Sequence, residues 1–117
     1  MSESNLPYDP GTLARKCDGD PAFIRHLVLL YLEDYPKQAQ VLHSALDNRD
    51  LERLYSISHS VKGAVSHFGA RQAVSAAEAV ESCCRRGDIG SAAPQASSLL
   101  VALEQLAQAL QRDYCSD

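Results

Sequence analysis

The sequence predicts an all-α domain, an antiparallel up-down four-helix bundle with a short additional helix at its N-terminal end. Apolar residues recur at helical spacing in four long segments. Short polar or glycine-containing links join these segments, as in bundles whose consecutive helices are antiparallel neighbours. No segment alternates between apolar and polar residues as a half-buried strand does.

Two Asp-Pro pairs predict the starts of the first two helices, because Asp is a good cap and Pro is tolerated at the first helical position. Asp9-Pro10 begins a helix of about two turns, and Asp20-Pro21 begins a long helix over about 21–47. Pro36 falls within the apolar pattern of this long helix. We expect it to kink or briefly break the helix near Glu33–Tyr35, because proline removes a backbone hydrogen bond.

Three further helices follow. Asp50 caps one that runs to about His67 or Phe68, and Gly69 is a left-handed stop after it. The next, over about 71–86, turns Glu78 and Glu81 more outward and carries an apolar line made of Ala73, Val74, Ala77, Val80 and Cys84. The last helix starts irregularly around 90–94, at a glycine and a proline, and then carries a leucine stripe to about Tyr114.

Length and charge restrict the class of protein. A chain of 117 residues is one domain's worth, and we expect a flexible lead-in over 1–8 and the bundle over 9–117. A net charge of −4 and no basic cluster longer than Arg85-Arg86 argue against a nucleic-acid partner. No apolar run is long enough to span a bilayer, and the first residues do not resemble a signal peptide. We therefore expect a cytoplasmic protein.

The four cysteines do not form a recognisable metal or redox motif. Cys83 and Cys84 are adjacent, so they are not a C-x-x-C pair, and Cys17 and Cys115 complete no zinc spacing with them. In a reducing compartment we expect four reduced thiols.

His59 is the candidate for chemistry. On a helical wheel begun at Leu51, it points about 150° away from the mean direction of the apolar residues. Its neighbours three, four and seven positions on are Lys62, Gly63 and Ser66. Lys62 places a positive charge where an anion bound to the imidazole would lie. Gly63 leaves room for a bulky group to come close to the imidazole, although a glycine inside a helix costs about 1 kcal/mol relative to alanine. The pattern predicts a site for a charged group that bonds to the imidazole, which is nucleophilic when neutral, and leaves again.

The pattern His59-x-x-Lys62-Gly63, followed by Phe68-Gly69-Ala70, resembles the signature of the histidine-containing phosphotransfer (HPt) domain. In that family the pattern is His-x-Leu-Lys-Gly-x-x-x-x-Leu-Gly-Ala. Val61 and Phe68 replace the two leucines and keep the apolar character, and His67 stands where the family often has Asn. The resemblance covers roughly residues 9–112 and implies the same bundle.

The resemblance implies that His59 attacks an aspartyl phosphate of one response-regulator receiver domain, through Nε2, and passes the phosphoryl group to a second receiver. Lys62 would stabilise the phosphate, and Gly63 would leave access for the partner. Ser66 is a weaker candidate, either bonded to the imidazole or phosphate or simply solvent-facing. Tyr55 contacts either the partner or the edge of the core. Magnesium would come from the receiver, so the chain would need no metal or other cofactor of its own.

Two other classes of function remain open. A histidine-kinase dimerisation domain would pair its histidine with an acidic neighbour, where this chain has Ser60, and a nucleotide-binding domain would follow. A structural helical adaptor would use His59 for no chemistry. Four long helices in one chain predict a monomer, and the lack of a glycine-rich nucleotide motif predicts no autokinase activity. The expected partners are receivers of a hybrid sensor kinase and a downstream regulator. The sequence leaves open the identity of these receivers, the direction of flow, and whether the chain is free-standing or a C-terminal piece of a hybrid kinase.

Overall fold

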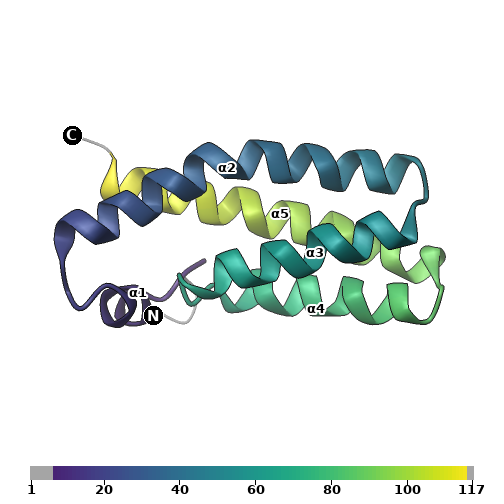
Figure 1. The fold of residues 1–117 in the computed structure, drawn as a ribbon, viewed down its shortest axis with the longest axis horizontal. Coiled ribbons are helices and arrows are strands. Elements are labelled where there is room, and N and C mark those ends of the chain that lie inside the picture. Colours follow the sequence, from purple (N-terminus) through teal and green to yellow (C-terminus); the bar gives the residue numbers. More distant parts are fainter. Residues whose placement is uncertain (1–6, 116–117) are drawn as a thin grey trace.

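The computed structural model describes residues 7–115, which contain five α-helices and no strand. In chain order the helices are α1 (Pro10–Lys16), α2 (Pro21–Asp47), α3 (Leu51–Ser66), α4 (Arg71–Arg85) and α5 (Ile89–Tyr114). The four long helices run alternately in opposite directions, and α1 lies at one end of them (Figure 1). Each long helix packs against two others, so that α2, α3, α4 and α5 form a closed ring. The predicted four-helix bundle with a short N-terminal helix is confirmed.

Aspartate side chains cap four of the five helices. Asp9 and Asp20 accept backbone N–H groups at the starts of α1 and α2, each directly before a proline at the first helical position. Asp50 accepts the N–H of Arg53 at the start of α3, and Asp88 caps α5. These acceptors satisfy backbone donors that a helix leaves without a partner. The aspartate signals therefore placed the starts of α1, α2 and α3 correctly, whereas the irregular start predicted around 90–94 is wrong, because α5 begins at Ile89 and continues regularly.

The turn between α3 and α4 depends on Gly69. Its φ of +63° lies in the left-handed region that favours glycine. A Cβ at this position would lie 2.7 Å from the Cβ of Asp9 and 2.9 Å from that of Thr12. The segment before α1 approaches this closely because the Asp9 N–H donates to the carbonyl of Phe68 at 2.8 Å. Glycine is thus required both by the turn and by the segment packed over it.

The two internal prolines do not interrupt their helices. α2 continues through Pro36, so the predicted brief break near Glu33–Tyr35 is wrong. The ribbon of α2 does change direction along its length, from an oblique first part to a second part parallel to the bundle (Figure 1). Pro94 likewise lies inside α5, which begins at Ile89. Both prolines are exposed, where water can satisfy the carbonyl that loses its partner.

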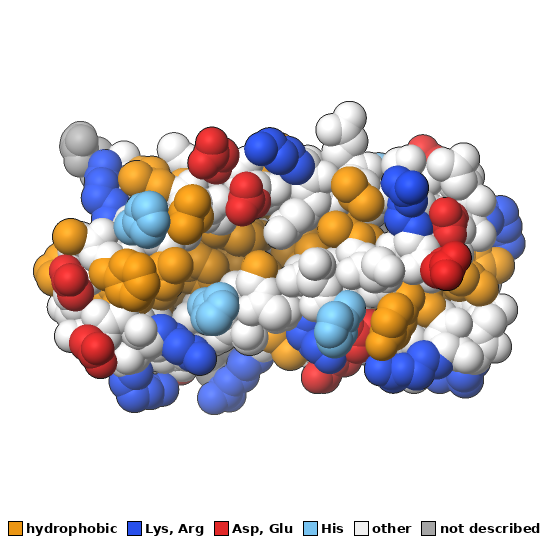
Figure 2. All heavy atoms as spheres, in the orientation of Figure 1, with side chains coloured by type: hydrophobic (Ala, Val, Ile, Leu, Met, Phe, Trp, Pro, Cys, Tyr) orange, Lys and Arg blue, Asp and Glu red, His pale blue; other side chains and the backbone are white. Residues whose placement is uncertain are grey.

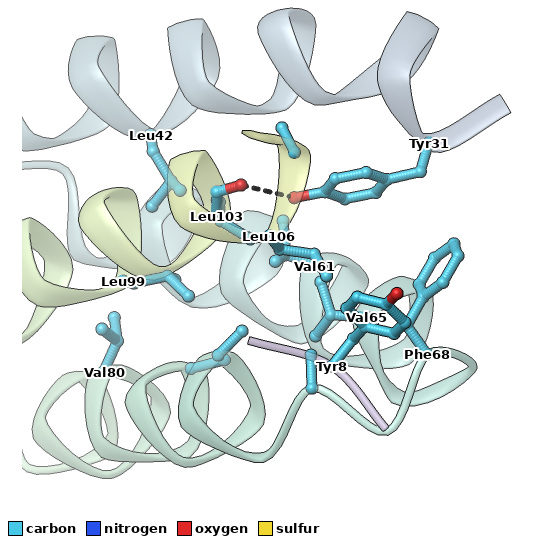
Figure 3. Packing of buried hydrophobic residues seen from close by; sticks show 14 of the residues in the cluster. Tyr8, Tyr31, Leu42, Val61, Val65, Phe68, Val80, Leu99, Leu103 and Leu106 are labelled. Carbon is cyan, nitrogen blue, oxygen red and sulfur yellow. Dashed lines mark hydrogen bonds between the residues drawn. The ribbon is translucent and has the colours of Figure 1, made fainter. Parts of the chain in front are cut away.

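Aliphatic side chains from all four long helices fill the centre of the bundle (Figure 3). The largest completely buried ones include Leu42, Leu54, Val61, Leu99, Leu103 and Leu106. Tyr31 is also buried, and its hydroxyl donates to the carbonyl of Leu103 at 3.0 Å, which joins α2 to α5 (Figure 3). A hydrogen bond of this kind avoids the cost of burying an unpaired polar group.

Tyr8 differs from the expectation of a flexible lead-in. It is 4% exposed, and its hydroxyl donates to Asp113 Oδ2 at 2.6 Å, beside the ring of Tyr114. Burial and the carboxylate of Asp113 raise the pKa of Tyr8 above its usual value. The packed part of the chain therefore begins before residue 9, while residues 1–6 lie outside the described residues.

All four cysteines are free thiols, and Cys17 and Cys83 are buried. Among residues 7–115, no helix has the length and apolar character to cross a membrane.

Candidate functional site

His59 lies on the outer face of α3, and its side chain is 64% exposed. The prediction that the helix presents this imidazole to solvent is confirmed. Its Nδ1 lies 2.8 Å from Oε2 of Glu81, on the neighbouring helix α4. Nε2 has no hydrogen-bond partner within residues 7–115. One ring nitrogen is therefore held by the fold, and the other is free to react.

Glu81 is the main correction to the sequence analysis. Its side chain is 2% exposed, so the prediction that it faces outward is wrong, whereas Glu78 is exposed as expected. On a helical wheel Glu81 is only about 40° from Ala77, which is completely buried. It therefore lies at the edge of the arc of α4 that faces α3. The four-residue spacing from Ala77 was the sequence signal for this position. A carboxylate is rarely buried unless it has partners, and the partners of Glu81 lie on another helix.

Two cations share the other oxygen of this carboxylate. Lys62 Nζ donates to Glu81 Oε1 at 3.0 Å, and Arg85 Nη2 lies 3.8 Å from the same atom. Burial disfavours the charged form of Glu81, but hydrogen bonds from Lys62 and His59 outweigh it, and the net effect is a pKa below the usual value. Glu81 is therefore ionised at neutral pH.

The charge of Glu81 determines the tautomer of the ring. An ionised carboxylate can only accept hydrogen bonds, so Nδ1 of His59 must carry the proton that joins them. In the neutral ring Nε2 then holds the lone pair and is exposed on the outer face of α3. Among the two nitrogens, the geometry selects Nε2 as the nucleophile.

The ring of Tyr55 flanks the imidazole on one side, and the guanidinium of Arg85 lies over that tyrosine ring. The ring of Tyr55 is nearly parallel to that of His59, with centroids 6.0 Å apart and an angle of 12°. Arg85 lies over Tyr55 at 5.4 Å from its centroid, and its Nη2 donates to the Tyr55 hydroxyl at 3.4 Å. Tyr55 thus packs against the imidazole itself. Arg85 was not predicted; its position four residues after Glu81 is the signal that could have found it.

The remaining candidates have separate places. Ser66 Oγ donates to the carbonyl of Gly63 at 2.7 Å and not to the imidazole, and the residue is exposed, which fits the solvent-facing alternative. No described atom lies within 4 Å of where a Cβ of Gly63 would stand, so packing does not require glycine there. His67 is exposed and caps the end of α3, as expected.

The described residues offer no obvious metal site. Within residues 7–115, three or more His, Cys, Asp or Glu side chains nowhere gather as metal ligands would. What the cluster offers is an exposed nitrogen nucleophile, a buried carboxylate behind it and two cations beside it, Lys62 and Arg85. Such a cluster suits transfer of an anionic group.

Comparisons with known proteins give a family and two solved structures of the same fold. A family model described as the Hpt domain matches residues 26–113. Histidine-containing phosphotransfer protein B (HptB) of Pseudomonas aeruginosa PAO1 is similar in structure, with a TM-score of 0.85 and 21% identity over 94% of this chain and 96% of that chain. The HPT domain of a hybrid sensor histidine kinase from Shewanella has a TM-score of 0.81 and 17% identity over 91% of this chain and 92% of that chain. No curated protein matches the chain.

The two solved structures have the same fold as this chain. The Hpt domain model matches well over half of the chain, which establishes the family. The signature around His59 and the bundle that carries it lead to the same assignment. The chain belongs to the Hpt domain family, a family of histidine phosphotransfer domains that act as phosphoryl carriers in phosphorelays.

Proposed function

We propose that the chain is a phosphotransfer protein whose His59 accepts a phosphoryl group from the aspartyl phosphate of one receiver domain and passes it to the aspartate of another. The observation that carries this proposal is the hydrogen bond between Nδ1 of His59 and Glu81, which leaves Nε2 exposed as the nucleophile. A rigid helix holds the ring for in-line attack, and positioning is the main contribution that phosphoryl transfer needs from a protein.

The transfer step balances on these atoms. The lone pair of Nε2 forms the N–P bond while the P–O bond to the aspartate of the receiver breaks, and its electron pair stays on the carboxylate that leaves. The Nδ1 proton remains in place, so the phosphorylated ring carries a positive charge. Glu81, at 2.8 Å, stabilises that charge as it develops. Reversal of the same step delivers the group to the second receiver.

Lys62 and Arg85 supply positive charge for the phosphoryl oxygens. In the unphosphorylated chain Lys62 is bonded to Glu81, and its side chain is 26% exposed. Arg85 is 62% exposed and lies farther from the same carboxylate, so it can turn outward at less cost. Both keep the cluster cationic around its one carboxylate, which favours an incoming dianion. Tyr55 limits rotation of the imidazole by stacking on it.

The partner supplies what the chain does not. Magnesium and the acidic pocket that binds it would belong to the receiver, and the phosphoryl group would come from the receiver without a nucleotide. We place the chain as a monomer in the cytoplasm, between a receiver of a hybrid sensor kinase and a receiver of a downstream regulator.

Incubation with a phosphorylated receiver domain tests the proposal. Wild-type chain should gain acid-labile phosphate, and His59→Gln should gain none. His67→Gln is the matched control, because His67 is also exposed, at the C-terminal end of α3, but has no hydrogen bond to a carboxylate among residues 7–115. Acid-labile phosphate that persists in His59→Gln would reject His59 as the carrier. No acid-labile phosphate on the wild type with any of the receivers would reject the carrier role and favour a helical adaptor.

A further inference from the structure

We propose that Ser58 is a positioning residue of the transfer step, and that its buried hydroxyl donates to Glu81 when Lys62 leaves that carboxylate for the phosphoryl group. This inference rests on the proposed function, in which Lys62 supplies positive charge to the phosphoryl oxygens. It adds a residue that the signature around His59 does not contain.

Ser58 carries an unpaired hydroxyl in the core. Apart from tyrosines and cysteines, Ser58 and Glu81 are the two buried polar residues of the part of the chain that the structure describes. Charged side chains are otherwise spread over the surface of the bundle, where water solvates them (Figure 2). Ser58 is 0% exposed, and its Oγ has no hydrogen-bond partner among residues 7–115. Because burial without a partner is unfavourable, such a hydroxyl indicates a second state of the site in which it has one.

The register of α3 and α4 brings Ser58 level with Glu81. His59 on α3 contacts Glu81 on α4. Four residues earlier on α3, Tyr55 contacts Arg85, which lies four residues later on α4. The two helices therefore keep one antiparallel register along this stretch. In that register Ser58 is offset from Glu81 by a single residue, or about 1.5 Å along the helix axis.

The two side chains also lie in the same interface. Lys62 follows Ser58 by one turn, about 40° around α3, and its ammonium reaches Glu81, so this flank of α3 faces α4. Ser58 lies on the inner side of the flank, since it is completely buried whereas Lys62 is partly exposed. Glu81 is likewise buried. The hydroxyl and the carboxylate therefore meet the same boundary between α3 and α4.

Departure of Lys62 would leave one oxygen of Glu81 without a hydrogen bond. Oε1 accepts from Lys62 Nζ at 3.0 Å, and the other cation near it, Arg85, is 3.8 Å away, beyond hydrogen-bond distance. A buried carboxylate that loses a donor holds its charge less well and would draw the Nδ1 proton from the phosphorylated ring of His59. Rotation of the Ser58 hydroxyl replaces the lost donor, so that Glu81 stays ionised and the proton stays on Nδ1.

A double-mutant cycle of Ser58→Ala and Lys62→Ala tests the exchange by thermal unfolding, without phosphorylation. In wild type Lys62 occupies Oε1, so Ser58→Ala removes only an unpaired hydroxyl and should leave the unfolding midpoint unchanged or raise it. In Lys62→Ala the hydroxyl should already donate to Glu81, so adding Ser58→Ala should lower the midpoint by about 5 °C. Ser56→Ala is the matched control in both backgrounds, since Ser56 is an exposed serine of α3.

Transfer kinetics test the positioning role itself. The receiver used is the one that transfers fastest to wild-type chain in a screen of phosphorylated receiver domains. Ser58→Ala should lower the maximal rate about fivefold, because the hydrogen bond that replaces Lys62 is lost. It should leave the half-saturating receiver concentration unchanged, because a buried side chain cannot contact the receiver.

Either measurement can overturn the inference. Equal effects of Ser58→Ala on the unfolding midpoint in wild type and in Lys62→Ala would show that the two residues do not share Glu81. An unchanged maximal rate would show that the hydroxyl takes no part in transfer, and a lower midpoint in wild type would mean that Ser58 supports the fold instead. If no receiver phosphorylates the wild type, the proposed function fails and the role in transfer fails with it, whereas the unfolding cycle still decides whether Ser58 can replace Lys62 at Glu81.

Discussion

Replacement of Glu81 by glutamine tests how the bundle prepares its histidine. The amide has the same shape as the carboxylate but no charge, so its oxygen can accept from only one side while its NH₂ group must face the other. If the oxygen faces His59, the NH₂ group points at the cations Lys62 and Arg85. If the amide is reversed, it donates to Nδ1 and moves the ring proton to Nε2, which removes the nucleophile.

The expected loss can be estimated from the hydrogen bond. A bond to a charged group contributes about 1.5–3 kcal/mol, and a neutral one about 0.5–1.5 kcal/mol. The difference of about 1–1.5 kcal/mol applies to the transition state, where the ring becomes positive beside Glu81. We therefore expect Glu81→Gln to lower the maximal transfer rate about five- to twelvefold. Its stability should change by less than about 1 kcal/mol, because removal of a buried charge also removes its desolvation cost.

Rapid-quench kinetics with a phosphorylated receiver measure the maximal rate, and thermal unfolding measures stability. Glu78→Gln is the matched control, since Glu78 lies on the same helix but is exposed. A rate for Glu81→Gln equal to that of wild type and of Glu78→Gln would refute the role of the carboxylate. A large fall in the unfolding temperature together with the rate would mean that Glu81 acts on the fold instead.

Four further predictions follow from the geometry. Lys62→Ala should slow transfer about fivefold and leave the fold intact, because one of the two cations that would stabilise the phosphoryl oxygens is lost; an unchanged rate in the kinetic assay would count against it. Gly63→Leu should stabilise the helix by about 0.5–1 kcal/mol and yet weaken receiver binding in calorimetry, since its side chain has space within the chain but not under a partner; unaltered affinity would contradict this. Gly69→Ala should destabilise the fold by about 1–3 kcal/mol in chemical denaturation, because the added Cβ meets Asp9 and the φ is positive; wild-type stability would show that the turn adapts. The low pKa of Glu81 means that its ion pairs stabilise the fold above about pH 4.3 and are lost as pH falls through the lower folded value. On acidification below about pH 4, wild type should therefore lose stability relative to Glu81→Gln. A stability difference between the two that does not change with pH would refute this prediction.

Most of the fold could be predicted because its signals are local. Caps such as Asp20 and Asp50 and the glycine at 69 act within a few residues of the chain, and the apolar stripes repeat along each helix. Pro36 shows the limit of a local rule, since a long helix held by packing on both sides of a proline continues through it. Tyr8 was missed because its partner, Asp113, lies at the other end of the sequence.

The site was predictable only on its own helix. His59, Lys62 and Gly63 are neighbours on α3, so their spacing predicts their arrangement. Glu81 and Arg85 belong to α4, and their meeting with His59 depends on the rotation and register of two packed helices. A single sequence states neither quantity. The phosphate-stabilising role of Lys62 stays a prediction, because the structure shows its ammonium bonded to Glu81 in the unphosphorylated chain.

Nuclear magnetic resonance of the phosphorylated chain, with ¹⁵N-labelled histidine, tests the central claim most directly because long-range correlations distinguish the two ring nitrogens. After transfer from a receiver, we predict a single phosphohistidine at His59, with phosphorus on Nε2 and the proton still on Nδ1 beside Glu81. Phosphorus on Nδ1, or on any other residue, would contradict the account.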